Sequence, residues 1–376
     1  MDIGEATLRH RPVLEPSAQK SEKDKDIDEG LVNDPRTASE ASEGECCQNN
    51  PDEGLLSKIS LPKIEEVIEK KIERIVHWAW NAVPFDRLPD WMQDNEFLHR
   101  NYRPPMYSFR GCVKSMFRMH TETWNIWTHL LGFVFFLVLC MGVYIFGDYI
   151  TFLFEDIQIH DLPWDEQVML FLFFLGAMAC LCCSFMFHLF SNHSEKMFAI
   201  FSRLDYSGIA FLITGSSLPA YYYYFYCTTL AKYTHISIMV VLCISSVSVS
   251  LWSKFSIPKY RPLRFAVFVI FGLYGVIPAM HILIREGFFV AYHGYSILGM
   301  VTMGSIYITG AALYVLRIPE RFFPGKFDIW ASSHQLFHIC VVTATLVHYD
   351  SLLSMVKYRL NIGGCIDNLP LDMLSV

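Results

Sequence analysis

The hydrophobic and polar positions divide the chain into a polar start, a short amphipathic stretch and a long apolar region. Residues 1–57 are rich in Glu, Asp, Lys, Ser and Asn and contain few aromatic side chains. Such a segment cannot bury enough apolar surface to fold, so we predict a disordered acidic N-terminal region. Between residues 61 and 80 the apolar positions recur about every 3.6 residues, which predicts an amphipathic helix. This helix packs on the protein's own face or, alternatively, lies on a membrane surface or a partner.

Seven apolar stretches follow, and each is close to the roughly 20 residues that a helix needs to span a bilayer. We place them at residues 124–146, 167–190, 204–226, 235–253, 264–284, 295–316 and 330–350. The pattern predicts an all-α membrane protein with seven transmembrane helices. The expected domains are the disordered region, a juxtamembrane segment (58–119), the helical domain (120–353) and a C-terminal tail (354–376).

The composition agrees with a membrane protein and excludes other classes. Hydrophobic residues make up 53% of the chain and charged residues 18%, whereas soluble domains carry about a quarter charged residues. No basic cluster with interleaved aromatics occurs, which argues against nucleic-acid binding. Most of the eleven cysteines lie in apolar runs, so we expect packed thiols. The absence of a repeated CxxC pattern excludes a cysteine-rich zinc site.

Lys and Arg residues near the span ends predict the orientation of the helices. Twelve of them flank the ends that share a side with the start of the first span, against four on the other side: Lys232, Arg285, Lys357 and Arg359. Because basic residues concentrate on the cytosolic side, we predict a cytosolic N-terminus and an extracellular C-terminus. This orientation is opposite to that of G-protein-coupled receptors.

Four ionisable residues fall at the predicted cytosolic ends of the second, third and seventh spans. His188 ends the second span, Asp205 starts the third, and His334 and His338 lie one helical turn apart in the seventh. Ionisable groups within membrane helices are costly and usually mark function. Three histidines leave a fourth coordination position open, as in a catalytic zinc site. We therefore predict Zn²⁺ bound by His188, His334 and His338.

A zinc ion in this place would activate a water molecule and polarise a carbonyl group. Asp205 would hold that water or act as the general base. Ser184, one turn before His188, would hydrogen-bond the water or a substrate oxygen; alternatively it bonds its own helix. The membrane setting predicts a lipid amide or ester as substrate. We expect the histidines near the other ends of the spans, including His235 and His281, to be packing residues.

Four motifs resemble those of the adiponectin receptors in the progestin and adipoQ receptor family, over about residues 84–365. They are HTETWNIWTHLLG (120–132), SFMFH (184–188), LDYSGIA (204–210) and RIPERFFPGKFDIWASSHQLFH (317–338). The resemblance implies a seven-helix plasma-membrane receptor with zinc on His188, His334 and His338 and with Asp205 and Ser184 beside it. Trp124 departs from the motif, where a small residue is expected.

The same resemblance implies a function and partners. The family groups with alkaline ceramidases, which implies hydrolysis of ceramide to sphingosine and a free fatty acid, with signalling toward fatty-acid oxidation and glucose uptake. The implied partners are membrane lipids, an adiponectin-like extracellular ligand and a cytosolic adaptor at the N-terminal region. Formation of a homo-oligomer stays open.

Two rival interpretations remain. The chain could be a receptor without catalysis, in which zinc is structural and holds the helices together. It could also be a membrane di-iron desaturase, because His188 and His193 form an HxxxxH pair and His334 and His338 an HxxxH pair. No HxxHH box occurs in the chain, which disfavours the desaturase.

Overall fold

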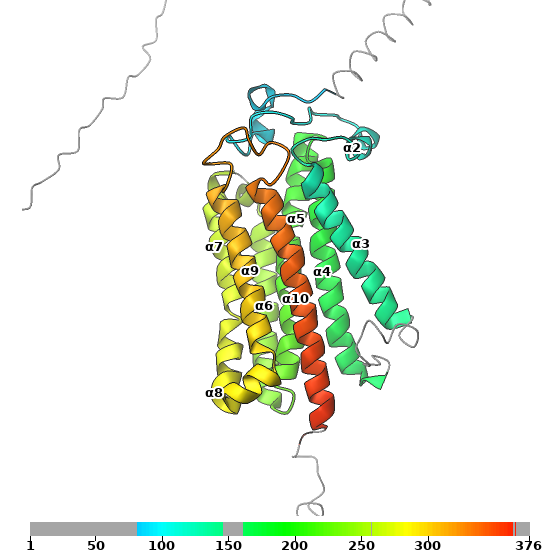
Figure 1. The fold of residues 1–376 in the computed structure, drawn as a ribbon, viewed down its shortest axis with the longest axis vertical. Helices are drawn as coiled ribbons and strands as arrows, with labels where there is room; N and C mark the ends of the chain where they lie inside the picture. Colours follow the sequence, from blue (N-terminus) through cyan, green and yellow to red (C-terminus); the bar gives the residue numbers. More distant parts are fainter. Residues whose placement is uncertain (1–80, 146–160, 257, 364, 366–376) are drawn as a thin grey trace, which may run out of the picture. The chain divides into compact units, whose positions relative to one another are not determined.

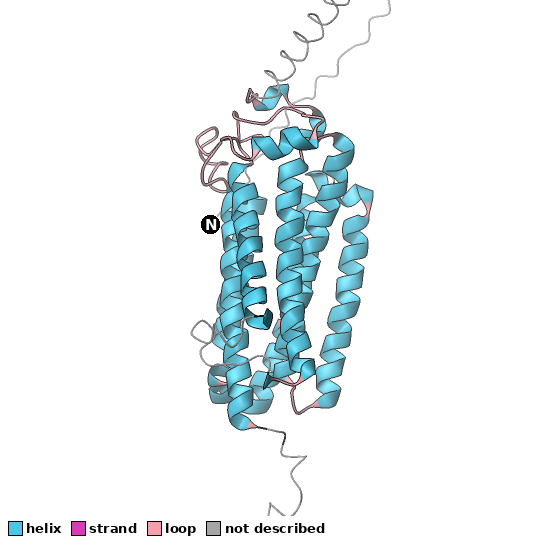
Figure 2. Cartoon of the chain, turned by 90° about the vertical axis from the view of Figure 1, so that its right-hand side faces the viewer, coloured by secondary structure: helices cyan, strands magenta, loops and turns pink. Residues whose placement is uncertain are grey.

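The computed structural model describes residues 81–145, 161–256, 258–363 and 365. The described residues form helices and loops, with one isolated β-bridge between Val83 and Tyr102. Within the described residues, seven spans are long and apolar enough to cross a membrane, and they run side by side (Figures 1 and 2). They comprise α3 (Thr123–Ile145), α4 (Trp164–Phe190), α5 (Glu195–Tyr224), α6 (Thr229–Leu251), α7 (Arg261–Leu273) with α8 (Val276–His293), α9 (Ile297–Leu316) and α10 (Ser333–Ile362). The predicted all-α fold with seven membrane-capable helices is confirmed. The predicted disordered region and amphipathic helix lie outside the described residues.

Helix α4 packs against α5 and α3, and α10 packs against α9, α3 and α5. The contact between α4 and α5 is very close at Gly176 and Gly215. A Cβ atom added to Gly176 would lie 2.6 Å from the Phe211 carbonyl oxygen, and one on Gly215 equally close to that of Leu172. Only glycine lets the two backbones approach this far. This contact fixes the depth of α4 relative to α5.

The predicted fifth span is two helices and not one. Helix α7 ends at Leu273, and α8 begins at Val276. Pro278 explains the break, because its ring excludes a helical hydrogen bond to the carbonyl four residues earlier, at Tyr274. The break places Tyr274 at the junction of the two helices.

Two other helices are longer than expected. Helix α5 begins at Glu195, well before residue 204, because the Ser194 side chain accepts a hydrogen bond from the Met197 backbone N–H and caps an earlier start. Helix α10 continues to Ile362, beyond the predicted end at residue 350. Near that end Arg359 forms an ion pair of 2.7 Å with the fully buried Glu166 of α4. The polar pair extends the contact between α4 and α10 past the apolar stretch.

The juxtamembrane segment, here residues 81–122, covers one end of the bundle. It contains η1 (Phe85–Arg87), η2 (Asp90–Met92) and α2 (Phe109–Ser115). Asp328, in the loop between α9 and α10, accepts hydrogen bonds from the backbone N–H groups of His99 (2.8 Å) and Arg100 (3.1 Å). These bonds join the segment to the loop that leads into α10.

The cysteines that the structure describes divide into two groups. Free thiols occur at Cys112 and, as predicted, at Cys140, Cys180, Cys182, Cys183, Cys243 and Cys340. Cys227, after α5, and Cys365, after α10, form a disulfide bond that was not predicted. The disulfide joins the ends of two helices at the end of the bundle opposite the juxtamembrane segment.

Candidate metal centre

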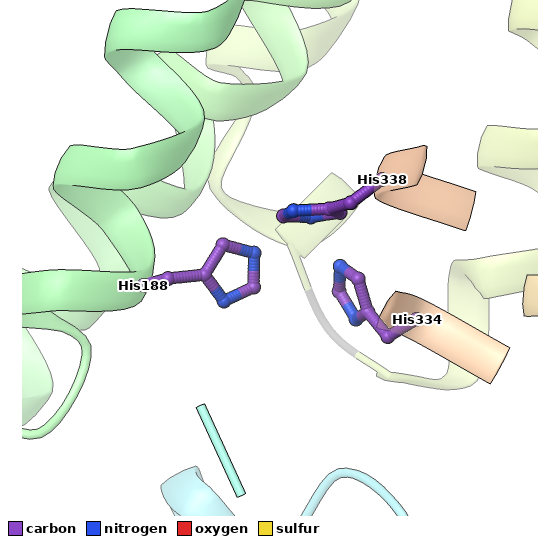
Figure 3. Close-up of side chains that lie close together, drawn as sticks. All are labelled: His188, His334 and His338. Atoms are coloured by element: carbon purple, nitrogen blue, oxygen red, sulfur yellow. The ribbon is translucent and has the colours of Figure 1, made fainter. Parts of the chain in front are cut away.

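Three histidine rings converge between α4 and α10 (Figure 3). His188 lies in the last turn of α4, and His334 and His338 lie in the first turns of α10. Each offers one ring nitrogen, and these atoms all lie within 4.8 Å of one another. His188 and His338 are buried, and His334 is half-buried. The structure therefore brings together the three residues that the spacing singled out.

The hydrogen bonds of the rings suit a metal. His188 Nδ1 lies 2.6 Å from Glu122 Oε2, while its buried Nε2 has no hydrogen-bond partner in the described part of the chain. His338 Nδ1 lies 3.1 Å from the Asn125 carbonyl oxygen. Metal-ligating histidines characteristically bind a carboxylate or carbonyl through the other ring nitrogen. The three imidazoles thus fit Zn²⁺ or another borderline divalent ion.

Glu122 is the functional residue that the sequence did not single out. Burial alone raises the pKa of its carboxyl, but the hydrogen bond with His188 and attraction to His188 and His334 outweigh it. The net pKa lies below the usual range, so the carboxylate is ionised and accepts the Nδ1–H of His188. Its position directly before an apolar span, inside the HTET motif, was the available signal.

His120 fixes the backbone at Glu122. Its Nδ1 accepts a hydrogen bond of 3.1 Å from the Glu122 backbone N–H, and its Nε2 lies 3.1 Å from the Ser115 carbonyl oxygen. Burial, with a smaller contribution from Arg103, lowers the pKa of His120 to about 3. The imidazole is therefore neutral near pH 7, which its acceptor role requires.

Arg103 holds the end of α4 that carries His188. The buried guanidinium donates to the carbonyl oxygens of His188 and Leu189 and, at 2.9 Å, to Ser115 Oγ. The last carbonyls of a helix lack intrahelical partners, and a cation there also complements the helix dipole. Arg103 thus fixes the turn from which the first histidine projects.

Glu320 holds the start of α10 in a corresponding way. This fully buried carboxylate accepts hydrogen bonds from the Ser333 backbone N–H (2.8 Å), the Ser333 hydroxyl and Asn95 Nδ2 (3.0 Å). A remote carboxylate therefore caps α10, where Ser332 provides no side-chain cap. The capped turn carries His334.

Ser184 and Asp205 lie beside the histidines. Ser184 is buried on α4, one turn before His188, and lies beside the half-buried carboxyl of Asp205 on α5. His188 also interacts electrostatically with Asp205. The prediction that Asp205 starts its helix is wrong, because α5 begins at Glu195, but the carboxylate is still next to Ser184.

Two further aromatic contacts border the site. The His129 ring stacks on His338, with centroids 3.6 Å apart, and neither of its nitrogens has a hydrogen-bond partner among the described residues. Trp124, the departure from the motif, contacts Trp330 with centroids 4.5 Å apart. Trp124 thus joins the start of α3 to the loop before α10 and leaves the three ligands in place.

Comparisons with known proteins agree with this architecture. A family model described as haemolysin-III related matches residues 117–349. The adiponectin receptor protein of Drosophila melanogaster is 48% identical over 324 residues, which cover 86% of this chain and 69% of that protein. Progestin and adipoQ receptor-like protein 1 of Caenorhabditis elegans is 46% identical over 283 residues, 75% of this chain and 62% of the relative. The chain belongs to the progestin and adipoQ receptor family. Heptahelical transmembrane protein 1 of Arabidopsis thaliana is 33% identical over 276 residues, 73% of this chain and 81% of the relative.

The region matched by the family model contains the three histidines and the residues beside them. The matched residues begin just before α3 and end within α10. They include the three histidines, Ser184, Asp205 and Glu122. The chain is thus a membrane protein of this family, and its three-histidine cluster lies inside the family region.

Proposed function

We propose that this receptor-family protein is a zinc-dependent hydrolase of lipid amides, with ceramide as the substrate class. The observation that carries the proposal is the Ser184–Asp205 pair beside the three histidines. A purely structural site needs ligands, whereas a hydrolase also needs a proton acceptor within reach of the reacting water. When bound, zinc supplies the Lewis acidity that activates water and polarises the scissile carbonyl.

The protein's own groups divide the work. Glu122 and the Asn125 carbonyl orient the rings of His188 and His338. Asp205 takes a proton from water and passes it to the leaving amine. In this proposal the hydroxyl of Ser184, which lies beside Asp205, orients the Asp205 carboxyl. The products from ceramide are sphingosine and a free fatty acid.

Two observations support a cytosolic position for the histidine cluster. Lys and Arg residues concentrate at that end of the bundle. The Cys227–Cys365 disulfide lies at the other end, and disulfides form in oxidising compartments. We therefore propose a cytosolic N-terminus and an extracellular C-terminus at the plasma membrane. A tag at the N-terminus should be labelled only after permeabilisation and a tag after Val376 on intact cells; the reverse pattern would contradict the orientation.

The decisive experiment compares two variants of the purified protein. Asp205→Asn should keep about one bound zinc but lower ceramide hydrolysis by roughly a hundredfold or more, because the amide cannot accept a proton. His338→Ala should lose both zinc and activity, because two ligands form a weak site. Asp90→Asn, at an exposed aspartate of η2, is the matched control and should change neither. Metal analysis and a fatty-acid release assay provide the two measurements.

Three outcomes would overturn the proposal. Full zinc occupancy in His338→Ala would refute the ligand assignment. Loss of zinc in Asp205→Asn would make Asp205 a fourth ligand and close the site. Absence of hydrolysis by the wild type would favour the second candidate, a non-catalytic receptor whose zinc joins α4 to α10. That candidate is supported by the origin of all three histidines from these two helices.

A further inference from the structure

A second histidine cluster lies in the half of the bundle away from the juxtamembrane segment. It joins three helical elements: His235 on α6, Tyr274 at the break between α7 and α8, and His281 on α8. His235 Nδ1 lies 3.0 Å from the Tyr274 hydroxyl, and His235 Nε2 lies 3.3 Å from His281 Nδ1. Figure 1 shows α8 at the far end from α2. None of these residues takes part in the three-histidine site.

The surroundings fix one ring and leave the other accessible. His235 is buried, with 8% of its surface exposed, and Phe225 stacks on it with centroids 4.9 Å apart. Phe225 also contacts His281, with centroids 4.8 Å apart, while the outer side of His281 is exposed. The pair therefore packs against Phe225 on one side, while His281 is exposed on the other.

The distance between the two nitrogens matches a shared metal ion. Two nitrogens bound to a tetrahedral ion at about 2.0–2.1 Å stand about 3.3–3.4 Å apart, and the observed separation is 3.3 Å. Tyr274 occupies the remaining nitrogen of His235, as the outer partner of a metal-ligating histidine does. A direct N–H···N hydrogen bond is the competing explanation of the same distance.

We propose that His235 and His281 form a second, weaker site for a borderline divalent metal ion such as Zn²⁺, with Tyr274 as the positioning residue. Water completes the coordination on the exposed side of His281. The ion displaces the single proton shared by the two facing nitrogens, and the ring that carried this proton takes one up at its other nitrogen, so both imidazoles bind in the neutral form. Binding ties α6 to α8 across the break between α7 and α8.

The position gives this link a physical consequence. Helix α6 and the α7–α8 span have few buried residues. Only 22% and 17% of an apolar 18-residue stretch in each is buried. The exposed hydrogen bond from Arg285 of α8 to Thr228, the residue before α6, is a further link between the two elements. A metal bridge stiffens this side of the bundle, so metal supplied at this end sets the rigidity of α6 and α8.

Zinc titration of the purified full-length protein against a chromophoric chelator tests the proposal. The wild type should bind two equivalents of Zn²⁺ with separate affinities. His235→Leu and His281→Leu should each lose the weaker equivalent and keep the tighter one, and the retained zinc reports correct folding. Tyr274→Phe should weaken the second equivalent by roughly tenfold, the lower end of the range for an outer partner.

The controls separate the two sites. His188→Ala should lose the tighter equivalent and keep the weaker one, so failure of the zinc-hydrolase proposal leaves this test intact. His293→Gln, at the end of α8, should keep both equivalents. A wild type that binds one equivalent, which His188→Ala then loses, would show that the contact is a histidine–histidine hydrogen bond and would overturn the proposal. Retention of the second equivalent in both His235→Leu and His281→Leu would overturn it equally.

Discussion

The two sides of the bundle differ in how tightly their helices are packed. In α3, α4 and α10, between 39% and 50% of an apolar stretch of 18 residues is buried. In α6, α7–α8 and α9 the corresponding share lies between 6% and 22%. The three histidines come from α4 and α10, and two of their hydrogen-bonding partners lie at the start of α3 (Asn125) and directly before it (Glu122). The tightly packed side therefore carries the site, while the other side presents its apolar residues to lipid.

The difference in packing explains why the metal ligands lie on the tightly packed side. A three-histidine site needs its nitrogens held within fractions of an ångström, which requires side chains locked by packing and hydrogen bonds. On the tight side, Arg103 fixes the end of α4 and Glu320 fixes the start of α10. On the loose side, Arg285 of α8 donates a hydrogen bond to Thr228 at the start of α6, but this link is exposed, whereas Arg103 and Glu320 are buried. The exposed helices of the loose side are free to adapt to lipid chains or to a partner.

Among the substitutions that test this comparison, that of Glu122 should have the largest effect on zinc affinity. Glu122→Gln should lower zinc affinity by about 10–100-fold, because the neutral amide holds the His188 ring less firmly and makes it a weaker ligand. Glu96→Gln is the matched control on the same segment, since Glu96 is 71% exposed and faces Arg317 at 3.6 Å. Surface pairs of this kind contribute little. Competition with a chelator measures the zinc affinity of each variant. Equal affinities in the two variants would show that packing alone holds the site.

Much of the fold could be predicted because the membrane imposes simple rules. Helix existence follows from apolar length, and the shared depth of His188, His334 and His338 follows from counting crossings. The four-residue spacing of His334 and His338 places them on one helix face. These features depend on local spacing, so a single sequence contains them.

The supporting contacts could not be predicted because they join distant segments through loops. Glu320 caps α10 from the preceding loop, and Asn95 reaches it from more than 200 residues away in the chain. The pairing of Cys227 with Cys365 among eleven cysteines likewise depends on which helix ends meet. The break after Leu273 was partly visible in Pro278, but the length of the apolar stretch favoured one continuous helix.

Alanine substitutions at two glycines, one on each side of the bundle, should have a smaller effect. Gly176→Ala places a Cβ atom 2.6 Å from the Phe211 carbonyl oxygen and 3.1 Å from the Gly215 Cα, so α4 and α5 must move apart. Overpacking of this kind lowers the free energy of unfolding by about 1–3 kcal/mol. Gly304→Ala in α9 meets no atom within 4 Å in the described structure. It should change stability by at most about 1 kcal/mol, in the stabilising direction, because alanine favours a helix over glycine.

Thermal unfolding of the two variants in the same detergent measures the difference, and zinc content serves as a second readout. Gly176, Ser184 and His188 all lie on α4. A shift of α4 in Gly176→Ala should therefore move Ser184 away from Asp205 on α5. We therefore expect Gly176→Ala to lose hydrolysis before it loses zinc, while Gly304→Ala keeps both. Equal destabilisation by the two substitutions would mean that α9 is packed as tightly as α4. The contrast between a tight site-bearing side and a loose lipid-facing side would then be wrong.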